Sequence, residues 1–167
     1  ECIQPEGPEV NLRFDTADKA LLSHQQVLRL RSEGGRNILT YKGHRASSGP
    51  IAVREEIETE VSDFQSAQQI LESLGYQIFF VYEKTRAVYR YQAVSLMVDH
   101  TPIGDYLEIE GPDEATIRSA ADSLGMDWAT GTDKSYTVLF HEWAEANGFP
   151  GRDMVFSEID DFRQGSA

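Results

Sequence analysis

Charged side chains recur at every second position in several short runs of apolar and β-branched residues. In YLEIEG (106–111), Glu108 and Glu110 alternate with Leu107 and Ile109. Successive side chains of a β-strand point to opposite faces, so this spacing puts both carboxylates on one face and both apolar side chains on the other. A chain that repeats this pattern is constrained to a sheet with one charged face and one apolar face.

The sign of the charge differs from one run to the next. Arginine alternates with leucine in VLRLR (27–31), and basic residues alternate again within IFFVYEKTRAVYRY (78–91). Acidic residues alternate in VREEIETEV (53–61), and Asp99 lies in VSLMVDH (94–100), the predicted hairpin partner of the long run before it. The pattern predicts a sheet in which basic rows and acidic rows share one face.

Two stretches have helical spacing of their apolar residues instead, SDFQSAQQILESLG (62–75) and PDEATIRSAADSLG (112–125), and both end in Leu-Gly. The remaining predictions are an irregular start (1–10), a strand (36–42), a loop (43–50), a last strand (134–140), a last helix (141–148) and a poorly ordered acidic end around Asp160 and Asp161. The predicted fold class is α+β, with the helices packed on the apolar face of an antiparallel sheet.

Two forms of such a sheet fit the pattern. If the charged face turns inward, the sheet becomes a closed antiparallel β-barrel, a tunnel with a charged lumen and helices outside. The alternative is an open sheet with a solvated, salt-bridged face. Rows of Arg and Lys bind phosphate oxygens, and clustered carboxylates bind hard divalent cations. A lumen that carries both predicts a site for a metal ion and a polyphosphate.

Composition limits the other possibilities. The formal net charge of −13 argues against a nucleic-acid or anionic-membrane surface, but not against a local basic cavity. The single cysteine, Cys2, is typical of a reducing compartment. The sequence contains neither an 18-residue apolar run nor a charged-then-apolar leader, so we expect a cytoplasmic protein.

A series of short motifs resembles the CYTH family, which comprises class IV adenylyl cyclases, thiamine triphosphatases and inorganic triphosphatases, also called triphosphate tunnel metalloenzymes. The motifs, in chain order, are FDT (14–16), LRLR (28–31), LTYKG (39–43), REEIETEV (54–61), EKTRAVYR (83–90), LMVDHTPIGDYLEIEG (96–111) and KSY (134–136). The resemblance implies one domain over residues 1–167, with a core at about 9–140 and a helical extension and tail at 141–167.

The resemblance also implies roles for individual side chains. The implied substrate-binding residues are Arg29, Arg31, Lys42, Lys84, Arg86 and Lys134. The implied metal ligands, for Mg²⁺ or Mn²⁺, are Asp99, Glu108 and Glu110, and the implied catalytic acids are Glu58 and Glu60. The family opens with a strand that bears Glu-x-Glu-x-Lys, followed by a helix. ECIQPEGPEVNLRFDT (1–16) matches neither, so we expect that strand to be missing from this chain.

The expected activity is metal-dependent hydrolysis of an inorganic, thiamine-linked or nucleoside triphosphate. The first alternative is class IV adenylyl cyclase activity, in which ATP gives cyclic AMP and pyrophosphate. The second is a polyphosphate-binding module without catalysis, which would not need the acidic residues. The expected partner is a small triphosphate and neither a nucleic acid nor a membrane, and a homodimer is left open.

Overall fold

The computed structural model describes residues 1–44 and 54–165. Most of the predicted loop at 43–50 therefore lies outside the described residues. The described residues form seven strands: β1 (Cys2–Asp15), β2 (Val27–Glu33), β3 (Arg36–Lys42), β4 (Glu56–Val61), β5 (Gln77–Tyr91), β6 (Val94–Thr101) and β7 (Gly104–Glu110). Their helices are α1 (Ala20–Ser23), α2 (Phe64–Ser73), α3 (Glu114–Ser123), the 3₁₀ turn η1 (Trp128–Thr130), α4 (Tyr136–Asn147) and α5 (Phe156–Gly165).

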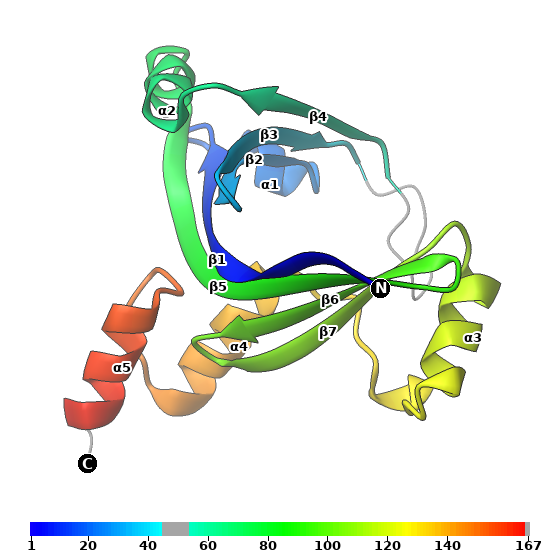
Figure 1. Cartoon of the computed structure of the whole chain (residues 1–167). Coiled ribbons are helices and arrows are strands. Elements are labelled where there is room, and N and C mark those ends of the chain that lie inside the picture. Colours follow the sequence, from blue (N-terminus) through cyan, green and yellow to red (C-terminus); the bar gives the residue numbers. More distant parts are fainter. Residues whose placement is uncertain (45–53, 166–167) are drawn as a thin grey trace.

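The strands make one antiparallel sheet in the order β4-β3-β2-β1-β5-β6-β7. The sheet curls strongly, so that β2, β3 and β4 lie over β5, β6 and β7 (Figure 1). The curl follows from the two long central strands, β1 and β5, whose pairing contains register shifts that bend the ladder. In the described part of the chain, β4 and β7 are the two edge strands. The described residues therefore form a strongly curled sheet in place of the expected closed barrel, because the edge strands β4 and β7 are not paired with each other.

Residues 1–10 are a strand and not the predicted irregular segment. Pro5 and Gly7 gave the irregular prediction, but the β1–β5 ladder shifts register between Gln4 and Gly7, which accommodates the proline. β1 also lies in the middle of the sheet, between β2 and β5. The chain therefore does have a strand at this place in the fold, although its sequence lacks the Glu-x-Glu-x-Lys that the family's opening strand bears.

Helices α2 and α3 cover the apolar outer face of the sheet, as predicted. Under α2, the buried side chains of Leu12, Phe14 and Leu30 form one cluster with Leu71. A separate cluster under α3 contains the buried side chains of Val94, Leu96 and Ala120. Both helices begin at an aspartate N-cap whose carboxylate accepts a backbone N–H of the first turn. Burial of these leucine and valine side chains drives both contacts.

The segment 134–140 forms the start of α4 and not the predicted strand. Its β-branched and aromatic side chains favour a strand locally, but Phe140, Trp143 and Ala144 have helical spacing and pack into one apolar cluster. Gly148 ends the helix with a φ of 67°, a left-handed conformation that suits glycine. Tertiary packing therefore overrides the local preference.

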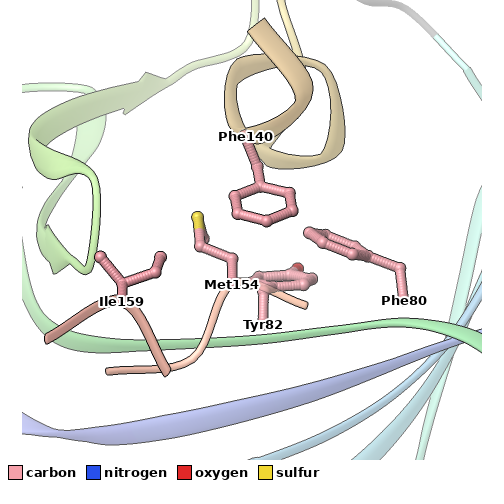
Figure 2. Close-up of a cluster of buried hydrophobic side chains, with 5 residues drawn as sticks. All are labelled: Phe80, Tyr82, Phe140, Met154 and Ile159. Atoms are coloured by element: carbon pink, nitrogen blue, oxygen red, sulfur yellow. The ribbon is translucent and has the colours of Figure 1, made fainter. Parts of the chain in front are cut away.

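The last apolar cluster attaches α4 and α5 to β5. Figure 2 shows Phe140 of α4 over Phe80 and Tyr82 of β5, with Met154 and Ile159 beside them. The amide of Met154 donates to the Val81 carbonyl at 2.9 Å, which extends the sheet along the part of β5 that β6 does not pair. Asp160 and Asp161 lie within α5, so the predicted poorly ordered end is a helix instead.

None of the helices in the described part of the chain has the length and apolar character needed to cross a membrane.

Candidate functional site

The concave inner face of the sheet carries the charged side chains. On β1, Glu9, Asn11 and Arg13 point to this face at a spacing of two, and all three are buried. The strand register places Arg31 opposite Asn11 and Lys84 opposite Glu9. Strands β2, β1 and β5 therefore bring basic and acidic side chains together, although they are far apart in the sequence.

Asp99 of β6 is the centre of one group of charges, called here the Asp99 cluster, whose members are Glu9, Lys84, Arg86, Asp99 and Glu108. Arg86 donates to both carboxylate oxygens of Asp99 at 2.6 Å, a bidentate arrangement. Lys84 Nζ donates to Asp99 Oδ2 at 2.8 Å and lies 3.5 Å from Glu9 Oε1. Glu108 Oε2 is 2.8 Å from Arg86 Nη2. The Asp99 side chain is 0% exposed, whereas that of Glu108 is 35% exposed.

Asp99 and Arg86 hold each other ionised within the Asp99 cluster. Burial raises the pKa of Asp99, but hydrogen bonds from Arg86 and the charge of Lys84 outweigh it, so that the pKa lies well below its ordinary value. Burial lowers the pKa of Arg86, and the carboxylates of Asp99, Glu108 and Glu9 more than reverse this effect. The cluster is therefore an ion-pair network in which Asp99 and Arg86 both keep their charge.

A second group, the Glu58 cluster, lies on β2, β3 and β4 and consists of Arg29, Arg31, Glu33, Thr40 and Glu58. Thr40 Oγ1 donates to Glu58 Oε1 at 2.6 Å, and the guanidinium groups of Arg29 and Arg31 lie 3.8 Å and 3.5 Å from the same oxygen. Burial raises the pKa of Glu58, but the Thr40 hydrogen bond and the two arginine charges lower it further than burial raises it. The Glu58 side chain is 39% exposed, so its carboxylate remains accessible.

Several buried polar atoms of this face have no hydrogen-bond partner among the described residues. Three are guanidinium donors, the Nε atoms of Arg13, Arg29 and Arg31, and two are acceptors, Glu9 Oε2 and Asn11 Oδ1. Burying a polar atom without a partner costs about 1–3 kcal/mol, and sites that bind ligands tolerate this cost. Burial, followed by the positive charge of Arg29, lowers the pKa of Arg13. The donors on β1 and β2 are therefore suited to an anion.

Most of the predicted site residues meet on the inner face. The two clusters contain seven of them: Arg29, Arg31, Glu58, Lys84, Arg86, Asp99 and Glu108. Lys42 pairs with Glu56 at 2.9 Å farther along β3 and β4.

Besides Lys42, three predicted residues lie outside the clusters. Lys134 is partly exposed and pairs with Glu142 of α4 at 2.7 Å, so its ammonium group is engaged away from the sheet. Glu60 makes an exposed pair with Arg36 at 3.0 Å. Glu110 is exposed at the end of β7.

Five residues of this face were missed from the sequence: Glu9, Asn11, Arg13, Glu33 and Tyr136. A signal for the first three was present, because EVNLRF (9–14) has the same alternation as the other strands. The prolines before it obscured the strand. Tyr136 lies in the KSY motif (134–136), but its segment was predicted as a strand, so the tyrosine was given no role.

The carboxylates do not form a complete metal cage by themselves. Within residues 1–44 and 54–165, no group of three or more His, Cys, Asp or Glu side chains is arranged to hold a metal ion. Mg²⁺ commonly uses only one or two carboxylates and completes its shell with water and substrate phosphates. Glu9 Oε2, which has no donor among the described residues, and the partly exposed Glu108 fit this pattern. Asp99 does not, because Arg86, Lys84 and Tyr136 occupy its oxygens.

Comparison with known proteins gives a consistent result. The family model described as "CYTH domain" matches residues 9–136. A protein of Methanocaldococcus jannaschii, named as a candidate adenylate cyclase, is 29% identical over 101 residues, which are 60% of this chain and 57% of the relative. The chain thus spans little more than half the length of that curated relative.

Two solved structures have a similar fold. A candidate adenylate cyclase of Vibrio parahaemolyticus gives a TM-score of 0.72 at 21% identity, over 84% of each chain. A candidate adenylyl cyclase of Hippeastrum, described as having a dominant triphosphatase activity, gives a TM-score of 0.65 at 21% identity, over 82% of each chain. At these identities the likeness shows the fold alone.

Proposed function

Because the chain belongs to the CYTH domain family, we propose that it binds a triphosphate against the inner face of the sheet and hydrolyses it with the help of a divalent cation. The observation that carries this proposal is that the buried Nε donors of Arg13, Arg29 and Arg31, on two adjacent strands, have no hydrogen-bond partner among the described residues. Guanidinium groups on adjacent strands fit an extended anion with many oxygens better than a single phosphate.

The two clusters have different parts in this proposal. Arg29 and Arg31, with Arg13 beside them, bind the phosphate oxygens, and the accessible Glu58 carboxylate holds the two β2 arginines in place before substrate arrives. Because the pKa of Glu58 is lowered, its carboxylate is a weak proton acceptor. We therefore assign Glu58 the positioning of Arg29 and Arg31 rather than removal of a proton from water.

Arg86 is the proposed phosphate contact of the Asp99 cluster. Asp99 fixes its guanidinium by the bidentate hydrogen bonds and is itself shielded from solvent. Glu9 and Glu108 are the residues that would hold Mg²⁺ or Mn²⁺, with Glu110 available at the exposed end of the same strand. The bound cation would neutralise phosphate charge and polarise the bond that breaks.

Cyclisation of ATP is the second candidate, favoured by the name of the Methanocaldococcus relative. Both reactions need the same triphosphate contacts, and they differ in the nucleophile. Hydrolysis uses water, whereas cyclisation uses the ribose 3′-hydroxyl on the α-phosphorus and releases pyrophosphate. The shared contacts do not distinguish the two reactions, so the products must.

The test incubates the protein with tripolyphosphate, thiamine triphosphate or ATP, each with Mg²⁺, with Mn²⁺ or with a chelator. Metal-dependent release of orthophosphate supports the proposal, whereas cyclic AMP with pyrophosphate supports the second candidate. Binding without any product refutes both and leaves an anion-binding module. Arg31→Ala should abolish activity, and Arg36→Ala is the matched control, because Arg36 makes an exposed pair with Glu60 at the strand edge. Equal loss in both variants would argue against a specific contact.

A further inference from the structure

Tyr136, the first residue of α4, reaches the Asp99 cluster from outside the sheet. We propose that Tyr136 is a positioning residue that fixes Asp99 and Lys84, so that helix α4 is part of the triphosphate site. The test of this inference by tripolyphosphate affinity rests on the proposed function. It concerns a residue to which neither the charge pattern nor the alternation of the strands assigns a role.

The tyrosine hydroxyl supplies a further donor to the buried carboxylate. Tyr136 Oη donates to Asp99 Oδ2 at 2.5 Å, and the same oxygen accepts from Lys84 at 2.8 Å and from Arg86 at 2.6 Å. Among the described residues, Oδ1 accepts a hydrogen bond from Arg86. Donors from β5 and α4 thus approach Asp99 from different elements, which leaves its side chain one orientation. Because Arg86 is aligned by Asp99, the hydroxyl of Tyr136 also sets the direction of the Arg86 guanidinium.

The tyrosine ring contacts Lys84 directly. Lys84 Nζ lies 4.7 Å from the ring centroid, within the range of a cation–π contact. Asp99 and Glu9 lie on the other sides of this ammonium group, and the Lys84 side chain is only 2% exposed, so the ammonium group is held in the wall of the site and is not free to follow a substrate phosphate. Lys84 is therefore better assigned to the framework of the site than to substrate contact, its expected role from the sequence.

The same ring connects the two charge clusters. It packs against Tyr82 at 5.9 Å and meets Tyr106 edge-on at 5.5 Å. The hydroxyl of Tyr82 accepts a hydrogen bond from Arg29 Nη1 at 3.3 Å, and Arg29 belongs to the Glu58 cluster. The next residue of α4 also contacts the charged face, because Thr137 Oγ1 accepts a hydrogen bond from Arg13 Nη1 at 3.3 Å. The first turn of α4 therefore contacts the Asp99 cluster directly, and Tyr82 links it to Arg29 of the Glu58 cluster.

The Tyr136 hydroxyl donates to Asp99 Oδ2 as a protonated phenol. Burial, together with the charges of Glu108 and Asp99, raises the pKa of Tyr136 far above its ordinary value. A protonated phenol can donate to a carboxylate, whereas a phenolate would repel it. The hydrogen bond is therefore present wherever the protein is folded and Asp99 is ionised.

The experiment compares Tyr136→Phe, which removes only the hydroxyl, with Tyr136→Leu, which removes the ring as well. Tyr91→Phe is the matched control, because Tyr91 also loses a hydroxyl contact, to Ser123 at 3.2 Å, but next to α3. Tripolyphosphate affinity is measured by calorimetry without metal, and melting temperature is recorded for each variant. We expect about a 3- to 10-fold weaker affinity in Tyr136→Phe and a greater loss in Tyr136→Leu, since small misplacements of binding groups are costly. Tyr91→Phe should bind as the unmodified protein does.

A second readout does not depend on substrate. The Hε protons of Lys84, assigned by NMR with a Lys84→Arg variant, should show an upfield ring-current shift that shrinks in Tyr136→Phe and disappears in Tyr136→Leu. If the unmodified protein binds no tripolyphosphate, the proposed function fails, and the Lys84 shift still tests the positioning. An unchanged Lys84 shift in Tyr136→Leu would overturn the inference. So would a Tyr136→Phe protein whose tripolyphosphate affinity equals that of Tyr91→Phe.

Discussion

Replacing Asp99 by Asn removes the negative charge on which the buried cations of the inner face depend. The substitution keeps the size of the side chain but puts an amide N–H₂ where a carboxylate oxygen accepts hydrogen bonds now. That new donor faces the donors of Arg86 and Lys84, which lie 2.6 and 2.8 Å from the carboxylate. Glu9 and Glu108 remain as their counter-charges.

The size of the effect follows from burial. Removing one partner of a buried ion pair costs about 3–5 kcal/mol, because the other charge stays buried. The carboxylates of Glu9 and Glu108 still neutralise part of the charge, so we expect the lower end, about 3 kcal/mol. In a chain of this size a loss of 1 kcal/mol lowers the melting temperature by about 2–4 °C, which predicts a decrease of about 6–12 °C for Asp99→Asn.

The pH dependence gives an independent check of the same reasoning. The folded protein holds the pKa of Asp99 below the unfolded value of about 3.9. A carboxyl group with a lowered pKa stabilises the folded state above the unfolded pKa, and this contribution is lost as pH falls from there toward the folded pKa. The difference in unfolding free energy between the unmodified protein and Asp99→Asn should therefore be constant from pH 7 to about pH 5 and shrink below about pH 4.

Urea unfolding followed by circular dichroism, repeated at each pH, measures both quantities. Asp105→Asn is the control, since Asp105 lies on β7 next to β6 and makes an exposed pair with His100. That change should stay within about 0.5 kcal/mol of the unmodified protein. A loss below 1 kcal/mol in Asp99→Asn, or a difference that persists unchanged at pH 3, would refute the ion-pair reasoning.

Three further substitutions test other parts of the structure. Phe140→Ala should cost about 3–5 kcal/mol in urea unfolding, because Phe140 is 1% exposed and packs on Phe80 at 5.5 Å; a loss under 1 kcal/mol would contradict this packing. Glu58→Gln removes the carboxylate charge that holds Arg29 and Arg31 in place, so calorimetry without metal should show severalfold weaker tripolyphosphate binding, and unchanged or tighter binding would contradict the positioning role. Lys134→Ala should leave that affinity within about twofold, as expected of an exposed pair with Glu142; a tenfold loss would show that Lys134 contacts the anion after all.

The alternation of charged and apolar residues was sufficient to predict much of the fold. Leu30 is buried in the apolar cluster under α2, and Leu28 packs against that cluster. Arg29 and Arg31 face the charged site instead, as the period of two requires. Helices α2 and α3 follow from their apolar spacing. These features are local, so a single sequence contains enough information to predict them.

The features that were missed depend on contacts between distant segments. The run from Tyr136 to Phe140 favours a strand by composition, and only its packing against β5 makes it a helix. Similarly, a sequence shows that Asp99 and Arg86 each lie on a charged face, but their pairing depends on the β5–β6 register. Asp99 was therefore predicted as a metal ligand, whereas the structure surrounds its oxygens with cationic and hydroxyl donors.

The contact between β1 and α4 affects when, during synthesis and folding, the anion site of the protein is completed. Arg13 and Thr137 are 124 positions apart, yet they touch within the site. Synthesis proceeds from the amino terminus, so β1 to β7 leave the ribosome before α4 and Met154 exist to complete them. Joining such distant segments also requires closing a long loop, which slows folding. A nascent chain therefore acquires its arginines early but its finished anion site last, only when translation has passed the helix that closes it.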